Sequence, residues 1–176
     1  MSGAEPILHA TVVAAWMGGA WRGAMLRGPS GAGKSALALC GLAAGARLAA
    51  DDRARVWASG GRLFARAPET LHGLIEARGL GVLPVAAPLP WAQVGLVVDL
   101  AADPAAIERT PEPEWETIAG VRVRRIALFG AESAAWAKLR LALQAATLGA
   151  GLEPAYQGRL ADEAKARRVK GASQEE

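Results

Sequence analysis

The chain has 176 residues, of which 52% are hydrophobic and 21% are charged. This composition excludes an intrinsically disordered chain and predicts one domain with a substantial hydrophobic core. The formal net charge is +3, and part of it lies in a basic segment at residues 165–170. Since no aromatic residue interleaves with these charges, we expect a solvated tail there and no nucleic-acid partner.

Two features bear on the compartment of the protein. Cys40 is the only cysteine, so no intrachain disulfide can form, which fits a reducing cytoplasm; we expect Cys40 to be a buried apolar residue. The first residues lack a basic region followed by an apolar run, so no signal peptide is expected. Residues 80–98 carry no charge, but Pro84, Pro88 and Pro90 interrupt them. We therefore predict a loop and a buried strand there rather than a membrane span.

The first predicted elements are two strands, at residues 7–16 and 21–26, joined by a turn. Both are apolar, and the first is rich in β-branched residues. A helix is then predicted from Lys34 to an end within residues 41–45. His9 lies in the first strand, where the pattern alone is typical of a histidine near a strand end.

Between the second strand and this helix, residues 28–35 match the phosphate-binding P-loop pattern G-x-x-x-x-G-K-[ST]. Glycines let several backbone N–H groups converge on one oxyanion, and the start of a helix places a positive dipole end beneath it. Lys34 can reach the β- and γ-phosphates of a nucleotide, and the Ser35 hydroxyl can ligate Mg²⁺. The expected nucleotide-binding residues are Gly28, Pro29, Ser30, Gly31, Ala32, Gly33, Lys34 and Ser35.

A polar pair follows a short strand predicted at residues 47–50. Asp51 and Asp52 are adjacent carboxylates, which repel each other unless positive charge lies nearby. Ligands of open α/β sheets bind at the carboxyl ends of strands, so the pair is a candidate for metal binding or proton transfer. An exposed acidic turn is the alternative. A hairpin follows, with strands predicted at residues 53–58 and 62–67 around a Gly-Gly turn.

Two further stretches carry candidate site residues. In residues 71–81, Glu76 and Arg78 stand among apolar residues and glycines, and a buried pair of this kind is costly without partners. A ligand or metal role and a plain salt bridge at a helix end both remain open there. Residues 94–99 predict an apolar strand that ends in Asp99, which a generic P-loop protein would use as the Walker-B acid that helps to hold Mg²⁺.

The last predicted elements are a short helix at residues 103–109, a loop at 110–115, a hairpin at 116–128 and a helix at 132–148. No internal repeat and no second domain are evident. We expect one domain at residues 5–152, followed by a flexible tail at residues 153–176.

Four stretches resemble motifs of one family, the catalytic domain of HPr kinase/phosphorylase, the bacterial HPr serine kinase. Residues 7–10 look like the family's histidine motif, residues 28–35 like its P-loop, and residues 48–53 like its double-aspartate motif. Residues 74–81 resemble its E-x-R-G-x-G stretch, which a generic P-loop protein has no reason to contain. The likeness spans residues 5–150 and implies an α/β fold, a single P-loop domain with a central mixed β-sheet related to PEP carboxykinase.

The resemblance implies a kinase that uses ATP and Mg²⁺ to phosphorylate a seryl hydroxyl of HPr, a small phosphocarrier protein of a phosphotransferase-type regulatory system. Many members also remove that phosphate by phosphorolysis, which consumes phosphate and produces pyrophosphate. By motif match, Asp51 would be the acid/base, His9 would support it, and Lys34 would bind phosphate. These three residues are the expected catalytic group.

The resemblance also implies a metal site and an assembly. Ser35, Glu76 and Asp52 would lie near the metal, and Arg78 would help to organise the site. Family members form hexamers, so a homo-oligomer is expected beside the HPr-like partner. A cytoplasmic location is expected as well.

The chain departs from the family pattern at residues 129–132, where a Pro-Gly-Arg-Asn motif should fall and its arginine and asparagine are missing. We therefore expect kinase action rather than phosphorolysis. Only a few residues precede His9, as in the shorter, catalytic-domain-only form of the family. Two alternatives stay open. One is a small-molecule P-loop kinase that uses Asp99 as its Walker-B acid, and the other is a non-catalytic regulatory module that senses ATP.

Overall fold

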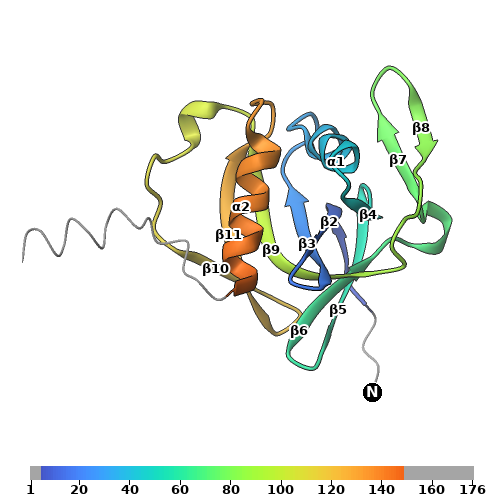
Figure 1. Cartoon of the computed structure of the whole chain (residues 1–176), viewed down its shortest axis with the longest axis horizontal. Helices are drawn as coiled ribbons and strands as arrows, with labels where there is room; N and C mark the ends of the chain where they lie inside the picture. The colour runs from blue at the N-terminus through green and yellow to red at the C-terminus, as the bar shows by residue number, and fades with distance from the viewer. Residues whose placement is uncertain (1–4, 149–176) are drawn as a thin grey trace, which may run out of the picture.

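A nine-stranded mixed sheet organises residues 5–148, the part of the chain that this computed structural model describes (Figure 1). Its strands are β1 (Ile7–His9), β2 (Thr11–Met17), β3 (Ala20–Arg27), β4 (Arg47–Ala50), β5 (Arg53–Ser59), β6 (Arg62–Arg66), β9 (Ala92–Ala101), β10 (Glu114–Ile118) and β11 (Val121–Phe129). The order across the sheet is β1-β5-β6-β9-β3-β2-β4, and β11 pairs with both β9 and β10. The expected α/β fold with a central mixed sheet is confirmed.

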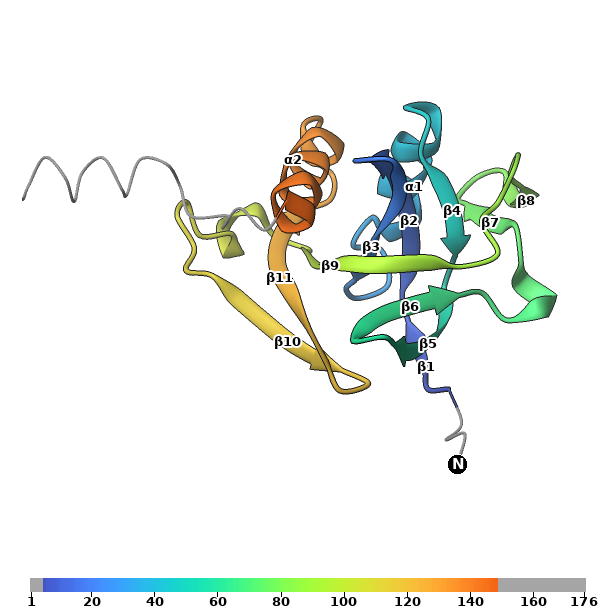
Figure 2. The same cartoon turned by 60° about the horizontal axis from the view of Figure 1, so that its bottom comes forward.

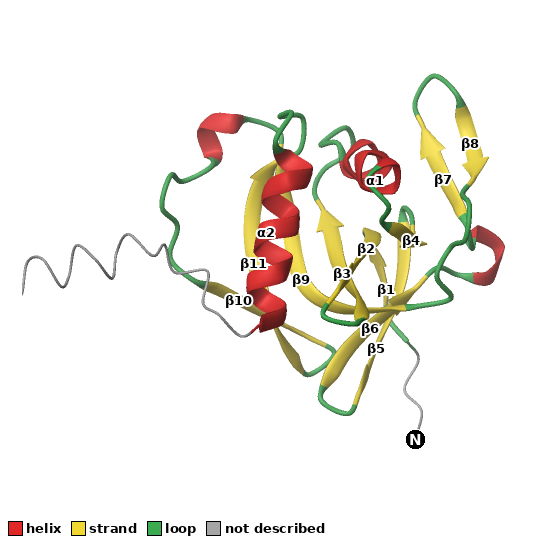
Figure 3. Cartoon of the chain, in the orientation of Figure 1, coloured by secondary structure: helices red, strands yellow, loops and turns green. Residues whose placement is uncertain are grey.

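The other elements decorate this sheet. Its two α-helices are α1 (Lys34–Ala43) and α2 (Ala135–Leu148), and the short 3₁₀ turns are η1 (Glu69–Leu71) and η2 (Pro104–Ala106). A separate antiparallel hairpin consists of β7 (Leu74–Ala77) and β8 (Gly81–Pro84). Figure 3 shows this hairpin standing beyond the main sheet, beside α1.

Strand β9 is the point at which the sheet bends. It pairs in parallel with β3 on one side, and on the other side with β6 at residues 92–94 and with β11 at residues 96–101. The register of β9 against β3 shifts between Gly23 and Ala24, an irregularity of the kind that bends and twists a strand. Figure 2 shows the result, with both helices on one side of β9 and with β5, β6 and β10 on the other.

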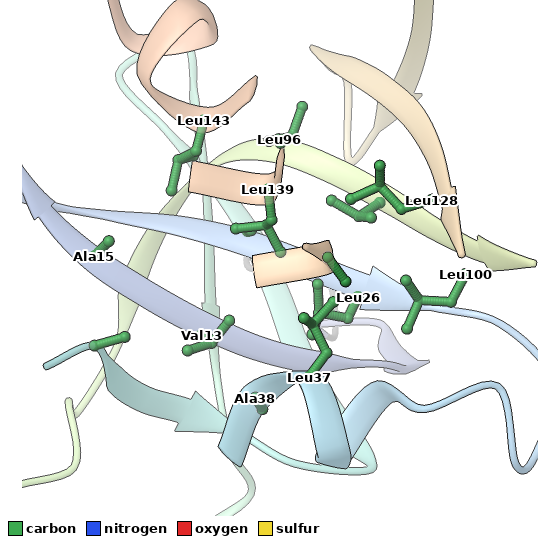
Figure 4. Packing of buried hydrophobic residues seen from close by; sticks show 14 of the residues in the cluster. Val13, Ala15, Leu26, Leu37, Ala38, Leu96, Leu100, Leu128, Leu139 and Leu143 are labelled. Atoms are coloured by element: carbon green, nitrogen blue, oxygen red, sulfur yellow. The ribbon is translucent and has the colours of Figure 1, made fainter. Parts of the chain in front are cut away.

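A hydrophobic cluster packs against each face of the bent sheet. The cluster under the helices includes Val13, Leu26, Leu96 and Leu139, and Figure 4 shows how these side chains interdigitate between α1, α2 and the strands. The second cluster lies between the opposite face and the β5–β6 hairpin. Successive side chains of a strand point to opposite faces, so the apolar strands β2, β3 and β9 contribute to both clusters.

The strand directions bring three polar segments to one edge of the sheet. Both β3 and β4 pair antiparallel with β2, so β3 and β4 run in the same direction. The loop after β3 and the Asp51-Asp52 pair after β4 therefore leave the sheet at the same edge. Thr11, the first residue of β2, lies at that edge too, opposite Leu26. Residues that are far apart in sequence are thus assembled at one end of the fold.

Most predicted elements are confirmed within a few residues, and four differ. The strand predicted at residues 7–16 breaks at Ala10 into β1 and β2, because β1 pairs with β5 while β2 pairs with β3 and β4. The loop predicted to begin at residue 80 contains the exposed strand β8. The helix predicted at 103–109 is only the turn η2, which Asp103 caps as expected. The loop predicted to residue 115 ends earlier, because β10 starts at Glu114.

The prediction that Cys40 is buried is wrong, since the structure places it on the exposed side of α1. The buried positions of this helix are Lys34, Leu37, Ala38 and Gly41, and Cys40 lies outside that stripe. No helix within residues 5–148 is long and apolar enough to span a bilayer. The tail predicted at residues 153–176 lies outside the described part of the chain.

Candidate functional site

The glycine-rich loop at residues 28–33 connects β3 to α1 in the strand–loop–helix order that the sequence predicts. Gly33 caps α1 with φ of 93°, a left-handed conformation that favours glycine. A Cβ atom at Gly28 would lie 2.7 Å from the carbonyl oxygen of Leu100, so only glycine allows the loop to lie this close to β9. The fold therefore requires glycine at both positions, and the first turn of α1 opens directly onto the loop.

Lys34 is the first residue of α1 and is almost fully buried. Its ammonium group donates hydrogen bonds to the carbonyl oxygens of Gly28 (2.9 Å) and Pro29 (3.1 Å). These contacts hold the positive charge across the glycine-rich loop. An anion in the loop would meet both the ammonium group and the helix N-terminus.

Asp51 is the hub of a hydrogen-bond network that links three strands and a helix. Its Oδ1 accepts hydrogen bonds from Thr11 Oγ1 (2.7 Å) and Ser35 Oγ (3.1 Å). Its Oδ2 accepts one from the backbone N–H of Glu76 (2.9 Å). Only 6% of Asp51 is exposed, so these donors replace the water that its charge has lost. The network ties β2, β4, β7 and α1 together at the sheet edge.

Asp52 has a different environment from its neighbour. Its carboxylate lies 3.1 Å from Nδ1 of His9, and both side chains are more than half exposed, at 59% and 57%. Asp52 has a φ of 62°, a left-handed conformation that aspartate tolerates better than most residues. This local turn separates the two carboxylates, because Asp51 enters the protein while Asp52 remains in solvent beside His9.

These groups face one cavity of about 440 Å³. It is lined by His9, Thr11, Ser30, Gly31, Gly33, Lys34, Ser35, Ala36, Leu39, Asp51, Asp52, Glu76, Ala77, Arg78 and Leu80. Of the residues that the P-loop pattern and the family resemblance assign to the site, the structure brings together all but Gly28, Pro29 and Ala32, which belong to the same loop without lining the cavity.

Glu76 and Arg78 belong to the cavity through the β7–β8 hairpin. Glu76 is in β7 and Arg78 follows it in the turn, so the segment is a strand and not the helix end of the salt-bridge alternative. Both side chains are exposed, which corrects the expectation of a buried pair. The backbone of Glu76 anchors the hairpin to Asp51, and the outward side chains of the hairpin form one wall of the cavity.

Asp99 does not line this cavity. Its carboxylate accepts hydrogen bonds from Arg27 Nε (2.9 Å) and from Arg125 Nε, and Arg27 also binds Glu116 (2.6 Å). The hydrogen bond to Glu116, together with the charges of both carboxylates, raises the pKa of Arg27 despite partial burial. Val98 and Leu100 point toward the helices, so Asp99 between them points to the opposite face of the sheet. These hydrogen bonds hold the Asp99 carboxylate on that face, away from the glycine-rich loop.

Two residues of the site were missed in the sequence. Thr11 is fully buried and makes the shortest hydrogen bond to Asp51. The sequence feature that could have indicated Thr11 is its hydroxyl group within an otherwise apolar strand, because a buried hydroxyl needs a hydrogen-bond partner. Gly130 packs against the glycine-rich loop, because a Cβ atom there would lie 2.8 Å from the carbonyl oxygen of Ala32. The departure at residues 129–132 thus lies next to the loop itself.

The residues present fit a phosphate group together with Mg²⁺. The loop and Lys34 supply donors and positive charge for an anion. Ser35, Asp51 and Glu76 offer oxygen atoms on the cavity wall, and Mg²⁺ is usually bound by one or two carboxylates together with phosphate and water. Within residues 5–148, no group of three or more His, Cys, Asp or Glu side chains forms a complete metal cage.

Comparison with known proteins places the chain in a family. The family model described as HPr Serine kinase C-terminal domain matches residues 7–129, well over half of the chain. Among solved structures, the Hpr(Ser) kinase/phosphatase from Coxiella burnetii is similar, with a TM-score of 0.65 and 22% identity, covering 90% of this chain and 99% of that one. A comparison with curated proteins gave no match. On the family match, and with the expected fold present, the chain belongs to the HPr serine kinase family.

Proposed function

We propose that the protein transfers the γ-phosphoryl group of ATP, with Mg²⁺, to a seryl hydroxyl of an HPr-like phosphocarrier protein. The observation that carries this proposal is the convergence of the glycine-rich loop, the Asp51 network, the His9–Asp52 pair and Glu76 on one cavity. Family membership adds weight, since the family is one of HPr serine kinases. When bound, ATP would supply the phosphoryl group and Mg²⁺ would neutralise its charge.

The glycine-rich loop is assigned to the nucleotide. Backbone N–H groups of residues 30–34 and the ammonium group of Lys34 would hold the phosphates. Phosphoryl transfer depends mainly on position and on charge neutralisation, and a rigid loop supplies both. Gly28 and Gly33 are required for this geometry by their close contact and their conformation.

Ser35, Asp51 and Glu76 are assigned to the metal. The motif match assigned Asp52 to this group, but the hydroxyl of Ser35 contacts Asp51. Asp51 would either bind the metal directly or hold Ser35 in position to bind it. Three hydrogen bonds fix its carboxylate beside that serine. Glu76 lies on the same cavity wall, with its backbone N–H bonded to Asp51.

Asp52 is assigned as the group that takes the seryl proton. The motif match gave this role to Asp51, but both oxygens of that carboxylate already accept hydrogen bonds. Asp52 is exposed, lines the cavity and lies beside His9, so its oxygens are accessible to an incoming hydroxyl. A positioned base typically contributes a factor of about 10²–10⁴ in rate. His9 would orient Asp52, since its Nδ1 lies 3.1 Å from that carboxylate.

The forward kinase direction is proposed as the main activity. Gly130 lies against the glycine-rich loop, and residues 129–132 lack the arginine of the family's motif there. A guanidinium at this position would help to hold inorganic phosphate, because it binds oxyanions in a bidentate way. Phosphorolysis by this chain is therefore expected to be weak.

The test combines the purified protein with an HPr-like carrier, labelled ATP and Mg²⁺. We expect label on a serine of the carrier, and we expect its loss when Mg²⁺ is chelated. Absence of label despite ATP binding would overturn the proposal and support an ATP-sensing module. Two variants separate the kinase classes, since Glu76→Gln should reduce Mg²⁺-dependent transfer and Asp99→Asn should not. The opposite pattern, with label on a small molecule, would support the alternative that uses Asp99.

A further inference from the structure

A second cleft, of about 550 Å³, lies outside the candidate site. It is larger than the cavity at the glycine-rich loop and shares no lining residue with it. Its lining comes from β5, β6, the η1 turn and the segment before β9: Arg55, Arg66, Ala67, Pro68, Glu69, Thr70, His72 and Pro90. Its volume is in the range of small-molecule sites, about 300–1,000 Å³.

Two arginines on neighbouring strands face this cleft. Arg55 in β5 and Arg66 in β6 are directly opposite partners in the antiparallel register. Ala54, Val56 and Ala65 beside them are fully buried on the inner face, so both arginines project from the outer face. Like charges directly opposite each other destabilise a sheet, and an anion bound between these two arginines would offset their repulsion.

The described residues compensate these charges only in part. Arg66 forms an ion pair with Glu5 (2.9 Å) through one guanidinium nitrogen, and it lies over the Trp57 ring at 5.4 Å. Within residues 5–148, Arg55 has no carboxylate within ion-pair distance. Since each guanidinium offers five N–H donors, most donors of the pair stay available to the cleft.

The walls of the cleft add groups suited to a small polar ligand. Thr70 contributes a hydroxyl and His72 an imidazole, both from the segment between β6 and β7. Glu69 is the single carboxylate among the lining residues, so the two guanidiniums outnumber it. We propose that this cleft binds a small molecule that carries a phosphate or carboxylate group, held by Arg55 and Arg66. The chemistry is the charge-assisted, bidentate recognition typical of arginine.

This site is independent of the proposed kinase function. The anion is recognised by the charges of Arg55 and Arg66, and none of the residues that line this cleft lines the cavity at the glycine-rich loop. Inorganic phosphate and citrate serve as probes, because one carries a phosphate and the other carries carboxylates. Binding is followed by the Nε–Hε signals of the arginine side chains in two-dimensional NMR and by calorimetry.

Four substitutions by glutamine define the test. Arg55→Gln and Arg66→Gln should each weaken probe binding by about tenfold or more, the value of one charge-assisted hydrogen bond. Arg62→Gln is the matched control, because Arg62 is on the same hairpin, about 13 Å along β6 from Arg66, and does not line the cleft. It should change affinity by less than about twofold. Glu69→Gln removes the opposing charge and should tighten binding.

The outcomes are distinct from those of the carrier assay. Binding at the glycine-rich loop would persist in Arg55→Gln and Arg66→Gln, so a probe that binds only there leaves both variants unaffected and overturns the proposal. Equal weakening by Arg62→Gln would indicate general surface attraction and would also overturn it. Thermal unfolding of each variant verifies folding, and Arg55→Lys, which keeps the charge, should retain part of the affinity.

Discussion

The hydroxyl of Ser35 donates a hydrogen bond to the carboxylate of Asp51, with 3.1 Å between Oγ and Oδ1. Ser35 is in the first turn of α1 and Asp51 directly follows β4, so this contact fixes the glycine-rich loop to a neighbouring strand end. Thr11 donates to the same oxygen from β2. The candidate site is therefore held by a buried carboxylate whose donors come from separate elements.

Thr11→Val tests the strength of this network. Thr11 is fully buried, and valine has nearly the same shape without the hydroxyl, so Asp51 would lose its shortest hydrogen bond. We expect the free energy of unfolding to fall by about 1–3 kcal/mol, the cost of a weakened buried charge. Urea denaturation measures this change. Thr11→Ser keeps the hydroxyl and loses one methyl group, at about 1 kcal/mol, and unchanged stability in Thr11→Val would contradict the network.

Asp52→Asn tests the proposed division between the two aspartates. Asparagine tolerates the left-handed backbone of this position, and the side chain is exposed, so stability should change by less than about 0.5 kcal/mol. Transfer to an HPr-like carrier should fall by about 10²–10⁴-fold in single-turnover assays, with nucleotide binding retained.

Asp51→Asn is the matched comparison for Asp52→Asn. An amide NH₂ at Asp51 would face the N–H and O–H donors that now surround the carboxylate, so this variant should lose stability as well as activity. If Asp51→Asn kept full stability and lost transfer while Asp52→Asn stayed active, the base would be Asp51, as the motif match alone suggests.

Local patterns sufficed to predict the glycine-rich loop, its helix and the acidic pair, because each depends on a few consecutive residues. The sequence could also place His9 and Glu76 near the loop through the family resemblance, and both line the cavity. The separate partners of Asp51 and Asp52 could not be predicted. They depend on one backbone angle, the φ of 62° at Asp52, and on donors from β2 and β7 that only the folded chain brings together.

Other errors have the same origin in tertiary context. Cys40 is apolar enough for a core position, but the packing of α1 on β2 and β7 decides which stripe of the helix is buried. Strand β8 lacks the alternation of apolar and polar residues by which a strand is predicted. All four of its residues are exposed, and the strand pairs only with β7. Whether Asp99 could act as a metal ligand depended on whether another residue forms an ion pair with it. The residue that does so, Arg27, is 72 residues away in sequence, so no local pattern indicates the pair.

Arg27→Met tests the charge network around Asp99. This change leaves Asp99 and Glu116 without the guanidinium that bridges them, and the part-buried carboxylates then repel each other. We expect the free energy of unfolding to fall by about 2 kcal/mol, less than for a fully buried pair because solvent screens these groups. Asp99→Asn should cost less, since Arg27 keeps Glu116.

The pH dependence of the Arg27→Met effect has a definite sign. The pKa of Arg27 is raised in the folded protein, first by its hydrogen bond to Glu116, so its contribution is fully present below the unfolded pKa. That contribution disappears only as pH rises through the still higher folded pKa. The stability difference between wild type and Arg27→Met should therefore be constant between about pH 6 and pH 9. A difference that declined across this range would show that Arg27 is not the bridging cation.

Gly41→Ala tests the contact between the two helices. A Cβ atom at Gly41 would lie 2.7 Å from two ring carbons of Trp136, in the six-membered ring of the indole. Alanine in a helix interior normally stabilises by about 1 kcal/mol relative to glycine, but a clash of this kind costs about 1–3 kcal/mol and should dominate. We expect a net loss of stability in urea denaturation. Trp136→Phe removes the clashing atoms, so Gly41→Ala should regain its stabilising effect in that background; a stabilising Gly41→Ala beside the native Trp136 would show that α2 can shift away at little cost.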